Sequence, residues 1–185
     1  DLTTVLSEVS CRRYVDMTSH TQDETIAKAY MEFVENIDPL CEDYNNKLER
    51  KLIEHPNVHE LESEFGVYIR DVRTSLELFR KENIPLFTKE TTEIQNYQKI
   101  TSTMSVEDNG ETKTLQQMAS LLTSTDRNIR ENAWRKIAAR RLQDKERLDD
   151  AFDKLFKIRI QIAQNSGYND YLDYIFKAKS RFDYS

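Results

Sequence analysis

The sequence contains few of the residues that interrupt helices. Its 185 residues include only three glycines and three prolines, whereas a β-rich fold with many tight turns needs more of both. Charged residues make up 32% of the chain and hydrophobic residues 38%, which is enough to build a helical core. We therefore predict an all-α fold of long antiparallel helices, arranged as a bundle or as an array of helix hairpins.

Residues that hold metals are also scarce. Cys11 and Cys41 lie thirty residues apart, which fits neither a zinc knuckle nor a disulfide framework, and we interpret them as buried thiols in a reducing cytoplasm. His55 and His59 are four residues apart, but Pro56 stands where the zincin motif H-E-x-x-H has its glutamate. We predict no metal ligand and no catalytic residue in this chain.

The sequence has no long apolar run and no general excess of positive charge. No run approaches the roughly 20 apolar residues that a membrane helix needs, and no signal peptide is recognisable. The net charge of −6 argues against nucleic acid, because phosphates select basic surfaces. We predict a cytoplasmic protein that binds neither a membrane nor nucleic acid.

The longest helix-forming stretch runs from Thr125 to Gly167. Its apolar residues recur at helical spacing, and the first group of them is Ile129, Ala133, Trp134, Ile137 and Ala138. The stretch predicts one helix of roughly 60 Å or two helices broken near Asp144. Between Arg127 and Arg159 it carries eleven Lys and Arg against six Asp and Glu. This excess fits a solvated face with i,i+4 ion pairs or a basic wall that faces an acidic partner or peptide.

Two shorter segments depart from a continuous helix. Asp108, Asn109 and Gly110 separate two short non-helical runs, and an Asn-Gly pair in that position predicts a β-hairpin, here near residues 102–114. A second helix is expected over residues 23–53, and Pro39 should kink or restart it because a proline ring displaces the carbonyl four residues back.

Aromatic residues, tyrosines above all, gather in the last part of the sequence. Tyrosine joins an apolar ring to a hydroxyl group, so the cluster fits either helix packing or the lining of a peptide-binding cleft. The candidate cleft residues are Tyr171, Tyr174, Arg181 and Tyr184.

Several segments, in order and in spacing, resemble the N-terminal half of oligoendopeptidase F, a family of zinc metallopeptidases related to the thimet oligopeptidases. They are Glu77–Leu86, Tyr97–Ile100, Asp126–Trp134, Ala139–Leu142, Asn165–Tyr168, Asp173–Tyr174 and Arg181–Tyr184. Two departures are visible, since Ser166 stands where the family usually has alanine and Tyr168 where it has phenylalanine.

The resemblance implies an almost entirely helical fold that closes around a deep channel for short peptides. The family's zinc ligands and catalytic glutamate lie on an H-E-x-x-H helix and a downstream helix that no position here matches. Residues 1–185 would form an N-terminal helical portion, part of the channel's wall and lid, cut from a longer protein and inactive alone. Its partner would be the missing C-terminal catalytic half, and zinc is expected in the parent protein.

A second interpretation is a helical module that binds a protein or a peptide without hydrolysing it. Asp126–Ala133 resembles the start of a HEAT-type helix, and stacked helix pairs form solenoids. However, no unit of about 40 residues recurs, as a solenoid requires. A degenerate peptidase relative that binds peptides without cutting them is another form of this interpretation.

Overall fold

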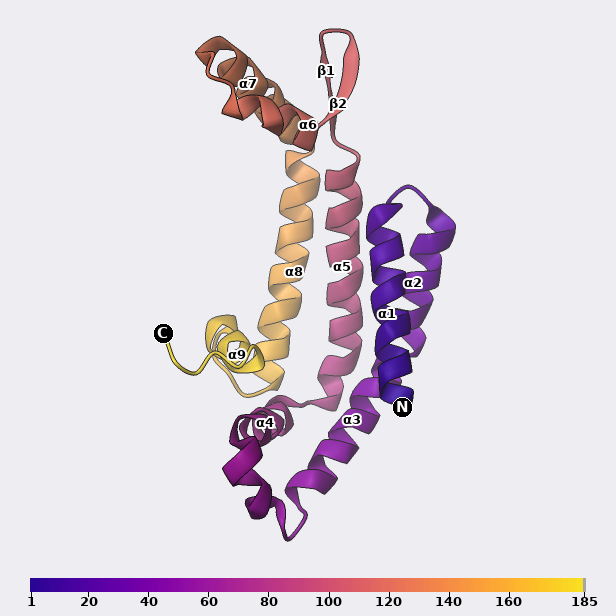
Figure 1. The fold of residues 1–185 in the computed structure, drawn as a ribbon, viewed down its shortest axis with the longest axis vertical. Coiled ribbons are helices and arrows are strands. Elements are labelled where there is room, and N and C mark those ends of the chain that lie inside the picture. Colours follow the sequence, from indigo (N-terminus) through magenta and orange to yellow (C-terminus); the bar gives the residue numbers. More distant parts are fainter. Residues whose placement is uncertain (185) are drawn as a thin grey trace. The chain divides into compact units, whose positions relative to one another are not determined.

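The computed structural model describes residues 1–184, and most of them are helical (Figure 1). The helices are α1 (Leu2–Ser19), α2 (Glu24–Asn36), α3 (Asp38–Ile53), α4 (Val58–Leu78), η1 (Lys81–Asn83), α5 (Ile84–Ser102), α6 (Leu115–Ser120), η2 (Leu121–Thr123), α7 (Arg127–Gln143), α8 (Lys145–Asn165) and α9 (Tyr171–Ala178). Strands β1 (Ser105–Asp108) and β2 (Glu111–Thr114) form an antiparallel hairpin. The prediction of an all-α fold with one small hairpin is confirmed.

The chain divides into two compact units. The first combines Asp1–Thr92 with Leu155–Ser185, and the second is Glu93–Lys154. Helices α5 and α8 each contribute residues to both units, so the first unit is discontinuous in sequence.

The first unit is built from helix hairpins (Figure 1). Helices α1 and α2 pack against each other, as do α3 and α4, and Met17, Tyr30 and Val34 form a small core between the first pair. Asp23 caps α2 by accepting bonds from two backbone N–H groups. Pro39 lies in the first turn of α3, where a missing N–H costs nothing, so the predicted restart of the helix at this proline is confirmed.

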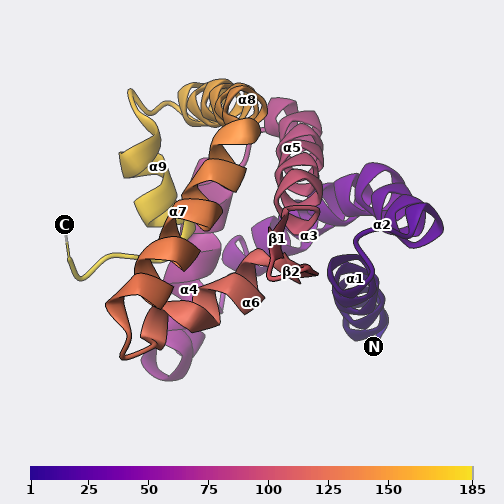
Figure 2. The same cartoon turned by 90° about the horizontal axis from the view of Figure 1, so that it is seen from above.

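The second unit joins the β-hairpin to α6 and α7 (Figure 2). Asn109 (φ 53°) and Gly110 (φ 82°) both adopt positive φ, as a two-residue hairpin loop of type I′ requires. Thr114 then caps α6 in a reciprocal capping box with Gln117. The hydrophobic core of this second unit consists of Ile100, Met104, Leu115, Met118, Ala133 and Ile137.

A buried carboxylate fastens the hairpin to α7. Asp108 accepts hydrogen bonds from Lys113 Nζ at 2.8 Å and from Lys136 Nζ at 2.7 Å. Lys113 lies on the neighbouring strand β2, opposite Val106, whereas Lys136 lies on α7. The hydrogen bonds from Lys113 and Lys136 lower the pKa of Asp108 below its ordinary value of 3.8.

We expect Asp108→Asn to destabilise the protein near neutral pH and to have less effect in acid. A carboxylate with a lowered pKa contributes stability above its unfolded-state value of about 3.9, and this contribution is lost as the pH falls through the folded-state value. Urea unfolding of both proteins at about pH 7 and about pH 3 measures the difference. Asp149→Asn, which removes a carboxylate from the exposed Lys145 pair, is the matched control. A loss of the same size at both pH values would contradict the expectation.

The long stretch around residue 144 is two helices. Asp144 leaves the helical conformation (φ −103°, ψ 14°) between α7 and α8. Its buried carboxylate accepts from Arg140 at 2.6 Å and from Arg147 at 2.7 Å, and these hydrogen bonds lower its pKa. Of the two predictions for this stretch, the two helices broken near Asp144 are therefore confirmed, and the single helix of roughly 60 Å is not.

Part of the basic excess in this stretch is neutralised locally. Pairs at i,i+4 spacing join Arg135 to Glu131, Lys145 to Asp149 and Lys154 to Asp150. These pairs are exposed, as the solvated-face interpretation requires, so solvent and salt screen them and they add little to stability.

Candidate functional site

Two of the segments that carry the family resemblance, Glu77–Leu86 and Asn165–Tyr168, meet at a buried hydrogen-bond network in the first unit. Asn83 is fully buried, and its Nδ2 donates to the carbonyl of Ile162 and to Ser166 Oγ, both at 3.1 Å. Asn165 Nδ2 donates to Asn83 Oδ1 at 2.7 Å. Ser166 Oγ donates in turn to the carbonyl of Leu78 at 3.0 Å. The network fastens the end of α8 to the α4–α5 connection, which is a structural role.

A charged contact on the surface extends this junction. Glu77 Oε1 accepts from Lys177 Nζ at 2.7 Å and from the Tyr168 hydroxyl at 3.0 Å. The hydrogen bond from Lys177, with that from Tyr168, lowers the pKa of Glu77, and the bond to Glu77 raises the pKa of Lys177. The phenylalanine that the family usually has at position 168 could not make this bond.

The four tyrosine and arginine residues predicted for a peptide cleft separate into two groups. Tyr174 is buried and its ring lies 5.9 Å from that of Tyr171, and burial raises the pKa of Tyr174 to about 12. Arg181 and Tyr184 instead contact Phe176, each 5.6 Å from its ring centroid. Their role in peptide binding stays a prediction.

Tyr174 lines a small hollow between α3, α4 and α9. The hollow has a volume of about 190 Å³, and Glu42, Asp71 and Lys177 contribute charged groups to its wall. Burial, with the nearby charges of Asp38 and Glu49, raises the pKa of Glu42. The hollow can hold a small polar group or the tip of a side chain.

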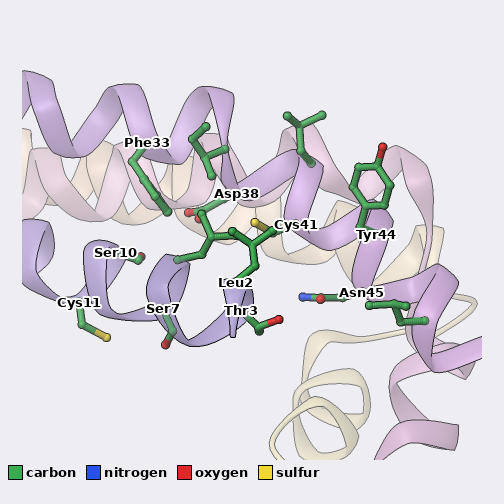
Figure 3. A pocket seen from close by; sticks show the side chains of 14 residues that line it. Leu2, Thr3, Ser7, Ser10, Cys11, Phe33, Asp38, Cys41, Tyr44 and Asn45 are labelled. Atoms are coloured by element: carbon green, nitrogen blue, oxygen red, sulfur yellow. The ribbon is translucent and has the colours of Figure 1, made fainter. Parts of the chain in front are cut away.

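A larger groove lies in the same unit between α1 and the α2–α3 region (Figure 3). Its volume is about 650 Å³, within the range of small-molecule sites. Ser7, Ser10 and Cys11 line it from α1, and Cys41 and Tyr44 from α3. The remaining wall consists of Leu2, Thr3, Leu6, Phe33, Ile37, Asp38, Leu40, Asn45 and Leu48. The groove therefore offers mainly apolar contacts.

Sequence reasoning missed this groove, although its residues lie on recognisable apolar stripes. Leu40, Tyr44 and Leu48 belong to the periodic face of α3, yet they are 57%, 62% and 63% exposed. The prediction that both cysteines are buried is wrong, because Cys11 is exposed and Cys41 is only partly buried. Both thiols belong to the open groove instead of a closed core.

The histidine pair has local structural roles at the turn before α4. His55 Nδ1 accepts from the backbone N–H of Asn57 at 3.2 Å, and His59 Nδ1 lies 3.0 Å from the carbonyl of Pro56. Within residues 1–184, no three His, Cys, Asp or Glu side chains are grouped so that they could hold a metal ion. The side chains of this part of the chain thus do not fit a zinc site. No helix among these residues has the length and apolar character needed to span a membrane.

Three solved structures share this fold. An oligoendopeptidase F assigned in Bacillus anthracis strain Ames is 23% identical, over 94% of this chain and 32% of its own, with a TM-score of 0.84. A 3.1 Å X-ray structure of an oligoendopeptidase F is 24% identical in sequence, and the match covers 97% of this chain and 32% of that structure's chain, with a TM-score of 0.89. PZ peptidase A, solved with an inhibitor, is 24% identical in sequence, and the match covers 94% of this chain and 31% of the chain of PZ peptidase A, with a TM-score of 0.84. At these identities the likeness establishes the fold.

A sequence comparison finds a similar family over the first part of the chain. Residues 1–79 match the profile of the Peptidase M3 N-terminal domain, whereas a search of curated proteins gave no significant match. The chain spans about a third of the length of the structures whose fold it shares. Residues 1–79 are thus similar to the Peptidase M3 N-terminal domain, and the chain as a whole has the fold of part of the oligoendopeptidase F and PZ peptidase A structures.

Proposed function

We propose that this chain is the N-terminal helical portion of a zinc-dependent oligopeptidase that hydrolyses short peptides. The observation that carries the proposal is the fold, which is shared over 94–97% of the chain with oligoendopeptidase F and PZ peptidase A structures about three times as long. The match of residues 1–79 to the M3 N-terminal domain supports the same assignment.

In this proposal the chain does not hydrolyse peptides by itself. The side chains of residues 1–184 do not fit a zinc site, so the metal and the catalytic residues would belong to the C-terminal half of the longer protein. The present helices would contribute the wall and lid of a channel that admits short peptides. The free thiols of Cys11 and Cys41 are consistent with a reducing cytoplasm, and no role with nucleic acid or a membrane is proposed.

The test compares residues 1–185 with the polypeptide encoded by the longer reading frame that contains them. We expect the longer protein to retain about one zinc ion per chain after desalting and to cleave a quenched fluorogenic peptide, because a bound zinc ion activates water for hydrolysis. Residues 1–185 alone should retain no zinc and leave the peptide intact.

Two controls make the comparison specific. Removal of zinc from the longer protein with a chelator should abolish cleavage, and added zinc should restore it. Cleavage by residues 1–185 alone would contradict the proposal. A longer protein that binds the peptide and leaves it intact with zinc present would instead support the non-hydrolytic interaction module.

A further inference from the structure

An exposed tryptophan lies among arginine side chains in the second unit. Trp134 on α7 is 60% exposed, whereas its neighbour Ala133 and the next-turn residue Ile137 are buried in the core. Trp134 lines an open hollow of about 480 Å³. We call this hollow the Trp134 surface, and its lining residues are Leu122, Arg127, Arg130, Glu131, Trp134 and Arg135. Tryptophan and arginine are both enriched among the residues that dominate the binding energy of protein interfaces.

The Trp134 surface is positive in a chain that is negative overall. Three arginines line it against one carboxylate, Glu131, while the whole chain carries a net charge of −6. Glu131 is already engaged, since it accepts a hydrogen bond from Arg135 Nε at 2.9 Å. Two guanidinium groups therefore remain without a carboxylate from the wall of the hollow.

One of these guanidinium groups is held in place by the backbone. Arg130 Nη1 donates to the carbonyl of Ser124 at 2.7 Å and to that of Thr125 at 3.0 Å. Carbonyl oxygens satisfy these N–H donors but leave the positive charge uncompensated. Arg127, the first residue of α7, is exposed at the rim. The geometry thus presents fixed positive charge beside an indole ring.

We propose that the Trp134 surface binds an acidic peptide segment in which carboxylates flank an apolar side chain. Guanidinium groups form strong, often bidentate, hydrogen bonds with carboxylates, and the indole ring with Leu122 supplies apolar contact beside them. The acidic remainder of the chain repels such a peptide and so favours this one face. Two uncompensated charges are few for a polyphosphate backbone, whose binding draws on many cationic contacts.

This inference goes beyond the proposed function, because it concerns binding by residues of this chain alone and requires no hydrolysis. The sequence predicts that the basic stretch faces either solvent or an acidic partner, and this proposal assigns the second role to the residues around Trp134 alone. Most of its charges pair locally, and those around Trp134 remain available.

Trp134 is the one tryptophan in the chain, so its fluorescence reports directly on this surface. The probe is an acetylated and amidated pentapeptide of alternating glutamates and leucines, titrated into residues 1–185 at low salt. We expect the emission of Trp134 to move to shorter wavelength, and quenching by iodide to fall about twofold as the peptide covers the ring. Caesium should quench less than iodide before the peptide is added, because positive charge repels it.

Substitutions then separate charge recognition from general binding. Arg127→Gln should weaken binding of the peptide by about tenfold, the effect of losing one charge-assisted contact. Arg141→Gln, an exposed arginine of the same helix that does not line the hollow, is the matched control and should bind as the unsubstituted chain does. Circular dichroism of each variant verifies that α7 stays folded.

Three outcomes would overturn the inference. The first is equal binding of a peptide in which glutamines replace the glutamates, and the second is equal weakening by both arginine substitutions. The third is tighter binding of a single-stranded oligonucleotide of the same charge, which would assign the surface to polyphosphates. None of these results bears on whether the longer protein is a peptidase.

Discussion

Replacing Asn83 by alanine is expected to lower the free energy of unfolding by about 3 kcal/mol, a large fraction of the stability of a domain this size. The side chain is fully buried and takes part in three hydrogen bonds, two as donor and one as acceptor. Without it, the carbonyl of Ile162 keeps only the backbone N–H of Ser166 among these partners, and the amide of Asn165 loses Asn83 Oδ1 as its acceptor. A buried polar group left unpaired costs about 1–3 kcal/mol.

Urea unfolding followed by far-ultraviolet circular dichroism measures this loss. Asn36→Ala is the control, since Asn36 is exposed and its amide donates to the carbonyl of Glu32 in its own helix, and we expect a change within about 0.5 kcal/mol. Ser166→Ala should cost less than Asn83→Ala, roughly 1 kcal/mol, because Asn83 keeps two of its three partners. An Asn83 variant as stable as the Asn36 variant would show that the network does not hold the junction together.

The second large effect is expected in the other unit, where Met118→Ala should destabilise by about 3 kcal/mol. Met118 is fully buried at the centre of the core that α6 shares with α5 and α7. Alanine would leave a cavity in this core. Truncation of a buried methionine costs the transfer free energy of the removed atoms plus a cavity term.

Thermal unfolding with matched urea titrations tests this expectation. Gln116→Ala changes an exposed residue of the same six-residue helix, so it controls for changes in helix propensity, and alanine at that position should be neutral or slightly stabilising. Equal midpoints for the Met118 and Gln116 variants would mean that α6 contributes little to the core.

The features that the sequence predicts correctly are those with local physical causes. Asn109 and Gly110 adopt the positive φ angles that define the hairpin turn, because these residue types tolerate them best. Pro39 restarts a helix since it lacks an N–H. The break at Asp144 coincides with a carboxylate that binds arginines one turn away on either side.

Features that depend on distant segments were not predictable in the same way. The periodicity of α3 places Leu40, Tyr44 and Leu48 on one face, but it does not tell whether another element covers that face. Trp134 follows the same helical rhythm as Ala133, although one is exposed and the other is buried. The partners of Asn83 lie about 80 residues away in sequence and carry no local signal. The candidate cleft residues were found from composition alone. Composition could not show that Tyr171 and Tyr174 contact each other while Arg181 and Tyr184 contact Phe176.

The discontinuity of the first unit has a consequence for how the chain folds during synthesis. Helices α1 to α4 leave the ribosome before the rest of this chain, but the partners of Asn83 belong to residues 162–166 and emerge about 80 residues after Asn83. The second unit, which is continuous from Glu93 to Lys154, is complete before them. We therefore expect it to acquire structure while the first unit still lacks α9 and the end of α8, because local contacts form before distant ones. Closing the junction at Asn83 is then a late folding event.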